Sequence, residues 1–182
     1  MRDILVAGLI SAVGEVSSRV KLQKLIYLLQ RMGSNFEFYD FSLRDFGPFA
    51  PELASTIDCI CAEDGMVIET KHLYPDDVVQ YSYRAKPSVA EALNKLLDDH
   101  FGAATSQLRT TAGVLVKEHT RVLEVAATAI YIRDELFYPE DEVWEEVQRL
   151  KGHLSNYPSL QEEARKLLAQ WDSEGALRRS AR

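Results

Sequence analysis

Two lysines, an amide and a phenol lie close together in a short basic segment, at Lys21, Gln23, Lys24 and Tyr27. Side chains of these types at this spacing could bind a phosphate group or a peptide. An alternative is that the two lysines pair at the surface with acids of the following helix or with Asp45. Surface pairs of that kind contribute roughly 0 to 1 kcal/mol to stability.

A short loop follows in which two opposite charges and two aromatic side chains surround a Gly-Pro pair. Its residues are Arg44, Asp45, Phe46, Gly47, Pro48 and Phe49. Binding residues concentrate on loops, and aromatic and Arg side chains dominate protein-binding hot spots. The sequence therefore predicts that this loop contacts a protein partner. The alternative is a turn whose phenylalanines fill the core.

The histidines and carboxylates do not have the spacing of a metal or catalytic site. His72, His100, His119 and His153 lack a His, Cys or carboxylate at metal-ligand spacing. The chain contains no G-x-S-x-G motif and no glycine-rich phosphate loop. The acids between 140 and 146 are typical of a solvated helix face. We therefore expect no catalytic residue, no metal and no cofactor.

The composition is that of an ordinary globular chain. Its 182 residues are enough for one compact domain, and 46% of them are apolar. Cys59 and Cys61 lie two positions apart on a predicted helix and point to different faces, so neither a mutual disulfide nor a shared metal is expected. A reducing compartment fits this cysteine usage.

The apolar segments are too short to cross a membrane, which takes roughly 20 residues. The apolar N-terminal stretch is interrupted by Ser11 and Gly14 and is typical of a core helix rather than a signal peptide. We therefore expect a cytoplasmic protein that does not contact membranes.

Hydrophobic spacing predicts the elements that position the candidate residues in the first half of the chain. Helices are predicted over 3–14, 19–32 and 51–64. Ser17 or Ser18 can cap the second helix, and Pro51 suits the start of the third. A short strand is predicted near 41–45, Gly47-Pro48 as a turn, and a β-hairpin from 66–72 and 78–84. Helices followed by a hairpin are the order of a winged helix.

The rest of the chain is predicted to be helical, over 88–101, 104–118, 121–136, 139–154 and 159–172. Ser88 with Glu91 and Ser159 with Glu162 have capping-box spacing, and Thr120 can cap the helix after it. The predicted fold class is mostly α with a small β-hairpin (α+β). A winged-helix-like half, 1–86, packs on a helical bundle, 87–175, in one compact domain, and a disordered tail occupies 176–182.

Charge argues against DNA binding through the third helix. A helix in the major groove needs Arg, Lys, Asn or Gln facing the bases. This helix has no basic residue and carries Glu52, Asp58, Glu63 and Asp64. The net charge of −7 also disfavours a general attraction to nucleic acid.

Several short segments resemble the YwgA-like proteins of bacteria and archaea: RVKLQKLIYLL, FGPFAPEL, VAATAIYIRDEL and VQRLKGHLS. More distantly, the KLQKL-Y and Gly-Pro segments resemble the Panacea domain, which includes SocA-type antitoxins. This chain has Phe46 and Phe49 around Gly47-Pro48, where a tyrosine is often found. The Panacea resemblance implies antitoxin, adaptor or defence-associated roles exerted through protein contacts.

We therefore expect a non-catalytic protein-interaction module, an antitoxin, adaptor or defence-system accessory of a prokaryote. Its partner would be a toxin, nuclease or protease component that docks on the Lys21–Tyr27 face and the Arg44–Phe49 loop. A winged-helix DNA-binding regulator is the first alternative, and an enzyme without a recognisable motif is the second. A homodimer is compatible with either binding function.

Overall fold

The architecture is mostly helical with a small β part, as predicted, and the described residues form two antiparallel hairpins where the sequence predicts one. The computed structural model describes residues 1–32, 38–74 and 79–173, so the tail predicted over 176–182 lies outside the described residues. The helices are α1 (Arg2–Val13), α2 (Arg19–Arg31), α3 (Pro51–Ile60), α4 (Pro87–Phe101), α5 (Thr105–Leu115), α6 (Thr120–Asp134), α7 (Glu140–Lys151) and α8 (Tyr157–Ser173). One hairpin consists of β1 (Ser42–Arg44) and β2 (Gly47–Phe49), the other of β3 (Val67–Leu73) and β4 (Val79–Ala85).

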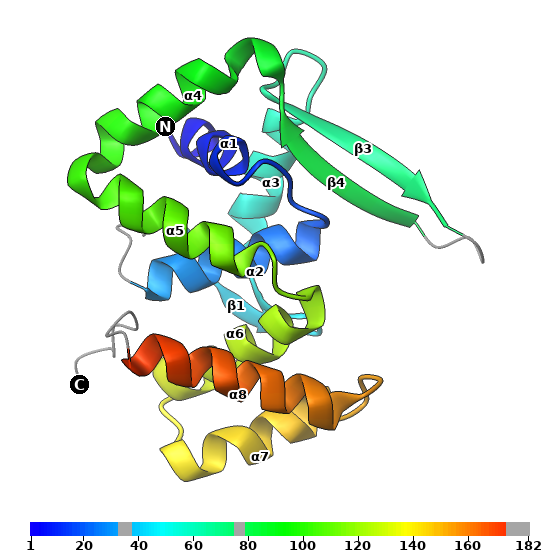
Figure 1. The fold of residues 1–182 in the computed structure, drawn as a ribbon. Helices are drawn as coiled ribbons and strands as arrows, with labels where there is room; N and C mark the ends of the chain where they lie inside the picture. The colour runs from blue at the N-terminus through cyan, green and yellow to red at the C-terminus, as the bar shows by residue number, and fades with distance from the viewer. Residues whose placement is uncertain (33–37, 75–78, 174–182) are drawn as a thin grey trace.

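Helix α1 is the centre of one lobe, in which it packs on α3, α4, α5 and β4 (Figure 1). Every residue from Leu5 to Ile10 is buried. At Gly8 a Cβ would lie 3.2 Å from the carbonyl oxygen of Leu93 in α4. Glycine at this position thus lets α4 lie close against α1.

Helix α6 is the centre of the second lobe, where it packs on α2, α7, α8 and β2. The side chains of α6 itself are mostly apolar and are buried on nearly all sides of the helix, which is typical of a core helix. Glu124, Thr128 and Asp134 are its buried polar residues. Because burying an unpartnered polar group is costly, each of these three requires a partner nearby.

The β3–β4 hairpin projects from the first lobe (Figure 1). Its register runs from Val67 opposite Ala85 to Leu73 opposite Val79. A backbone bridge between Val16 and Tyr83 ties the base of the hairpin to the α1–α2 connection. The order of α1, α2, β1, α3 and the β3–β4 hairpin agrees with the prediction, which did not include β2. The winged-helix interpretation stays a prediction.

Some helix ends differ from those predicted. Helix α3 ends at Ile60, before the predicted end at 64, and Cys61 is its C-cap. Helix α4 begins at Pro87, with Lys86 before it as the N-cap, so the predicted Ser88–Glu91 capping box does not form. Pro87 suits a first helical position because its missing N–H needs no partner there.

Of the caps predicted for three other helices, one is confirmed and two are wrong. Ser18 caps α2 by accepting a hydrogen bond from the backbone N–H of Lys21, as predicted. Helix α6 is capped by the His119 ring, which accepts from the N–H of Arg121 at 3.2 Å, instead of by Thr120. Helix α8 starts at Tyr157, so the Ser159–Glu162 capping box also does not form.

Candidate functional site

The short β1–β2 hairpin turns at Asp45 and Phe46. The prediction of a turn at Gly47-Pro48 is wrong, because these two residues begin strand β2. Gly47 has φ +84°, a conformation that residues with a Cβ rarely adopt. A Cβ at Gly47 would lie 2.7 Å from the hydroxyl oxygen of Thr128 in α6. Glycine at this position therefore allows the hairpin to lie directly on α6.

Side chains of α2 hold the second strand of this hairpin in place. The Gln23 amide donates to the carbonyl oxygen of Ala50 at 3.0 Å and accepts from the Ala50 N–H at 2.9 Å. The Lys24 Nζ donates to the carbonyl oxygen of Pro48 at 2.7 Å. Lys24 is only 1% exposed, so the idea that it forms a surface ion pair is wrong. Three-residue strands are too short to be stable alone, and these contacts supply the support.

A buried ion pair between α6 and α7 supports the turn. The Lys151 Nζ lies 2.8 Å from Glu124 Oε1, and both side chains are almost fully buried. Lys151 also donates to the carbonyl oxygen of Asp45, and Arg121 donates to Glu124 Oε2 at 2.7 Å. Both carboxylate oxygens are thus paired, as a buried ion pair requires.

Sequence reasoning missed this buried pair. One signal could have found half of it, because Glu124 is a lone carboxylate within the apolar run VLEVAATAI of α6. A carboxylate in a helix that is apolar on all sides has to meet a cation or a donor in the core. Nothing in the local pattern of α7 distinguishes Lys151 from an exposed lysine.

Burial lowers the pKa of Lys24 to about 7. The nearby Lys151 ammonium lowers this pKa further, and the Glu124 carboxylate opposes both effects. At neutral pH the Lys24 amine is therefore divided between its charged and neutral forms. An anion placed beside this amine would favour the charged form and raise its pKa.

A cavity of about 280 Å³ opens beside the hairpin, and we call it the hairpin cavity. It brings together six of the predicted residues: Gln23, Lys24, Arg44, Phe46, Gly47 and Phe49. Arg19 and Val20 of α2 and Ala54 and Ile57 of α3 complete the lining. At its edge, Phe46 is 53% exposed, and the guanidinium carbon of Arg121 lies 5.8 Å from the centre of its ring.

The other predicted residues do not line this cavity. Lys21 and Tyr27 are 7% and 0% exposed, and the Tyr27 ring packs edge-on against Phe41 at 5.1 Å. Asp45 and Pro48 contribute backbone carbonyls to the two lysine contacts described above. The predicted Lys21–Tyr27 face is thus an internal surface, and the exposed part of the predicted site is Arg44–Phe46.

The chain resembles one curated protein along most of its length. It is 31% identical over 119 residues to the uncharacterised protein YwgA of Bacillus subtilis (strain 168). This similarity supports a YwgA-like family. The aligned segment covers 65% of this chain and 66% of YwgA, slightly less than two thirds of that protein. No family model matches the chain.

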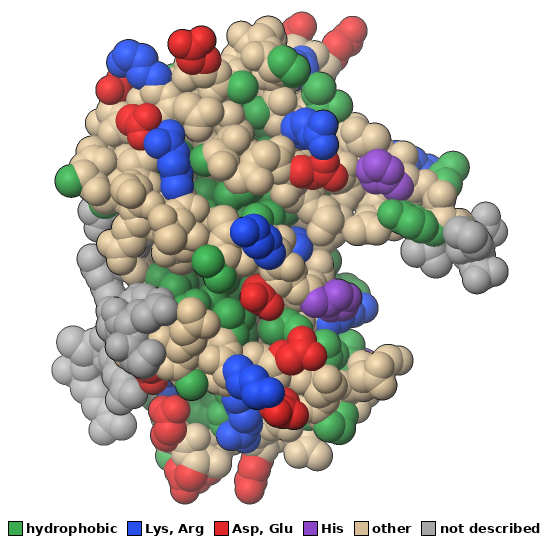
Figure 2. Space-filling view, in the orientation of Figure 1, with side chains coloured by type: hydrophobic (Ala, Val, Ile, Leu, Met, Phe, Trp, Pro, Cys, Tyr) green, Lys and Arg blue, Asp and Glu red, His purple; other side chains and the backbone are tan. Residues whose placement is uncertain are grey.

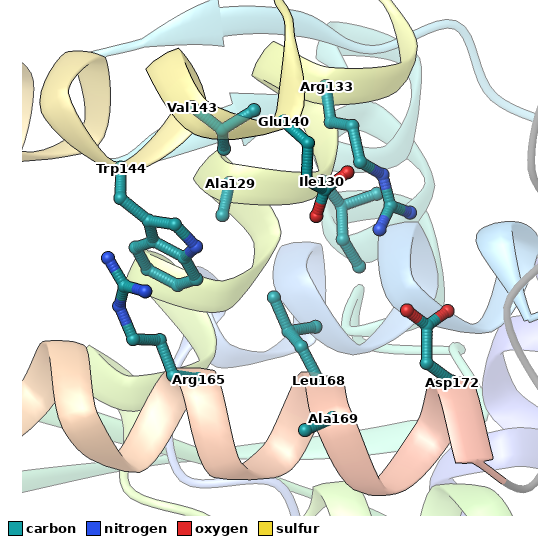
Figure 3. Close-up of a pocket in the computed structure, with 10 residues that line it drawn as sticks. All are labelled: Ala129, Ile130, Arg133, Glu140, Val143, Trp144, Arg165, Leu168, Ala169 and Asp172. Carbon is teal, nitrogen blue, oxygen red and sulfur yellow. The ribbon is translucent and has the colours of Figure 1, made fainter.

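A second cavity, of about 270 Å³, lies between α6, α7 and α8 (Figure 3). Arg165 lies over the Trp144 ring at one end, 4.3 Å from its centre. Arg133, Glu140 and Asp172 lie at the other end (Figure 3). Because both signs of charge line this cavity, it favours neither an anionic nor a cationic ligand.

An open hollow of about 440 Å³ lies beside Cys59. Three acids line it, and the Cys59 Sγ is 3.7 Å from Asp3 Oδ2. Cys59 and Cys61 are both free thiols. Within the described ranges, no three His, Cys, Asp or Glu side chains are grouped so that they could hold a metal ion. None of the helices in those ranges has the length and apolar character to cross a bilayer.

Proposed function

We propose that this YwgA-like chain is a non-catalytic protein-interaction module, an antitoxin, adaptor or defence-system accessory of a prokaryote. Its partner is a toxin, nuclease or protease component. The observation that carries the proposal is Phe46, an exposed aromatic side chain on a turn beside the hairpin cavity. Aromatic anchors at pockets contribute much of the free energy of protein association.

The support beneath Phe46 strengthens this proposal. Lys151 binds the carbonyl of Asp45, and Lys24 binds the carbonyl of Pro48. These two carbonyls flank Phe46 and Gly47. A turn held in this way loses little conformational entropy when a partner binds, because its backbone is already ordered. The two buried lysines therefore favour a preformed docking site.

The charges of the described residues favour a DNA-binding regulator less than they favour a protein-interaction module. Within α3, Glu52 pairs with Arg2 and Asp58 pairs with Arg19 at 2.6 Å, and the helix carries no Lys or Arg. In Figure 2, positive and negative side chains are interspersed over the face that is drawn. DNA phosphates favour a continuous positive surface, which this face does not offer.

An enzyme without a recognisable motif is the remaining alternative. Carboxylates that converge in a pocket would favour it, because paired acids perform general acid and base chemistry. The described lining of the hairpin cavity contains no carboxylate, whereas two acids line the cavity between α6, α7 and α8 and three line the hollow beside Cys59.

A capture experiment with two matched variants tests the proposal. Phe46→Ala removes the exposed aromatic side chain at the turn, and Phe137→Ala removes another exposed phenylalanine, from the α6–α7 connection. The immobilised protein is incubated with the purified product of each neighbouring gene, and the dissociation constant is measured. The proposal expects Phe46→Ala to weaken binding at least tenfold, as for a hot-spot residue, and Phe137→Ala to leave it unchanged.

Two outcomes would overturn the proposed function. One is that Phe46→Ala binds the partner as tightly as the wild-type chain does. The other is that no neighbouring product binds, while the chain binds promoter DNA with an affinity that falls steeply as salt is raised. A steep salt slope is the signature of phosphate contacts and would favour the regulator instead.

A further inference from the structure

The charges around the hairpin cavity differ from those of the chain as a whole. The chain carries a net charge of −7, whereas the cavity is lined by Arg19, Lys24 and Arg44 and by no carboxylate. Its other lining residues are Gln23, Gly47 and an apolar set that includes Phe46 and Phe49. A cavity of this composition complements a ligand that combines an apolar group with a negative charge.

Arg44 has donors that a ligand can use, and the Lys24 side chain lines the cavity although it is only 1% exposed. Arg19 is already occupied, because it pairs with Asp58 at 2.6 Å and with Glu69 at 3.1 Å. The Lys24 Nζ makes its hydrogen bond to Pro48, and an ammonium group carries three donors. Arg44 is exposed, and no carboxylate of the described chain lies within ion-pair distance of it.

The carboxylate that acts on Lys24 is not available to it as a full partner. Glu124 acts on Lys24 from α6, but its two oxygens are bound by Lys151 and Arg121. An incoming anion therefore does not compete with an existing carboxylate for Arg44 and Lys24. Bonds between charged groups are stronger where apolar side chains keep water away.

The size of the cavity favours the end of a polypeptide over a longer segment. The lining comes from α2, from the β1–β2 hairpin and from α3. Its volume of about 280 Å³ is at the small end of ligand sites, which span roughly 300–1,000 Å³. One apolar side chain and its terminal carboxylate fit a space of this size.

We propose that the hairpin cavity binds the free C-terminal carboxylate of a partner polypeptide whose last side chain is apolar. The apolar side chain contacts Phe49 and Ile57, and the carboxylate accepts hydrogen bonds from Arg44 and Lys24. This inference rests on the proposed function, since it specifies what the protein partner presents. Phe46 then contacts the residues that precede the bound terminus.

The experiment uses N-acetyl-leucine, which has the carboxylate, and N-acetyl-leucinamide, which lacks it. Each compound is titrated into the isotope-labelled full chain, and backbone amide shifts are followed by NMR. The carboxylate compound is expected to shift residues 44–49 and 19–24 saturably, with a dissociation constant on the order of 1 mM for a ligand of this size. The amide compound is expected to bind about tenfold more weakly.

Two arginine variants make the test specific. Arg44→Gln is expected to weaken binding of the carboxylate compound about fivefold and to leave the amide compound unaffected, because it removes one charge-assisted contact. The control is Arg84→Gln on the other hairpin, where the arginine is also exposed and pairs with Glu15. This variant is expected to bind both compounds as the wild-type chain does.

The failure of this inference is distinguishable from that of the proposed function. Equal binding of the two compounds, or an unchanged affinity in Arg44→Gln, would overturn carboxylate recognition even if Phe46→Ala still loses the protein partner. If the carboxylate compound binds as expected but no neighbouring gene product depends on Phe46, the cavity is a site for a free small acid. The inference about a polypeptide end is then overturned together with the proposed function.

Discussion

The two hairpins of this chain are stabilised in different ways. β3 and β4 pair over seven residues each, and the hairpin projects with Leu73 73% exposed. β1 and β2 have three residues each, and the backbone at Asp45 and Pro48 is bound by buried lysines from α7 and α2. The long hairpin combines a seven-residue ladder with contacts to Val16, Ser17 and Arg19, whereas the short hairpin has little ladder and depends on side chains of α2 and α7.

This difference explains why the shorter hairpin is the better candidate site. A projecting ladder can be held at its base and still move at its far end. A turn bound from two sides keeps its exposed side chains in one place, as a preformed recognition site requires. The support also makes the short hairpin sensitive to changes in α2, α6 and α7. Substitutions at the two hairpins and their supports test this contrast, from the largest expected effect to the smallest.

The Lys151→Met variant is expected to lower the free energy of unfolding by about 3 kcal/mol. It leaves Glu124 buried with Arg121 as its remaining charged partner and removes the donor to the Asp45 carbonyl. Urea denaturation measures the loss. Lys166→Met is the control, because Lys166 is exposed on α8 and pairs only with Glu162 among the contacts described, so its effect should stay within about 0.5 kcal/mol. Equal effects of the two variants would contradict a buried support.

The Gly47→Ala variant is expected to destabilise the chain by about 2 kcal/mol. A left-handed backbone costs an L-residue roughly 1–2 kcal/mol, and the new Cβ would contact Thr128 at 2.7 Å. The matched control is Gly113→Ala in α5, where a Cβ has no atom within 4 Å. That change should stabilise the helix by about 0.5–1 kcal/mol. Thermal denaturation that ranks the two variants the other way would contradict the close contact of hairpin and α6.

The Lys24→Met variant tests the buried amine through pH. The pKa of Lys24 is about 7 in the folded chain, whereas an ordinary solvated lysine has a pKa of 10.5, so between these values the unfolded chain binds more protons. Stability of the wild-type chain therefore rises with pH in that window, by up to about 1.4 kcal/mol per unit. Relative to Lys24→Met, the wild-type chain should gain about 2 kcal/mol between pH 7 and pH 9. Denaturation series at both pH values give the difference, and a constant difference would contradict the lowered pKa.

The smallest effect is expected at the end of the long hairpin. Leu73→Ser should change the free energy of unfolding by less than about 0.5 kcal/mol, because Leu73 is largely exposed and its pairing with Val79 is a backbone contact. Urea denaturation measures this value as well. A loss as large as that in Gly47→Ala would mean that both hairpins depend on side-chain support.

The helices were predictable because their buried faces recur with helical spacing. Ser18 was predictable as a cap because the bond it accepts comes from three residues ahead. The capping boxes failed because each starts inside a helix that begins earlier, at Pro87 and at Tyr157. A Ser-x-x-Glu motif looks the same at the start of a helix and just inside it. It therefore does not locate the helix start where a nearby proline also suits the first turn.

The candidate site was predictable only in part. Phe46 and its neighbours were found because aromatic and charged residues on a loop are unusual. The burial of Lys24 was not predictable from spacing, because a lysine on a helix is ordinarily solvated and the carbonyl that binds it lies on another element. Glu124 and Lys151 meet across two helices, and only the tertiary fold brings them to the same turn.

Hydrogen exchange in the Lys151→Met variant tests most directly whether the short hairpin depends on distant support. Peptides that cover 42–50 and 67–73 are compared with those of the wild-type chain under native conditions. The account predicts that backbone amides in 42–50 lose protection while those in 67–73 keep theirs. Unchanged protection in 42–50, or an equal loss in both segments, would contradict it.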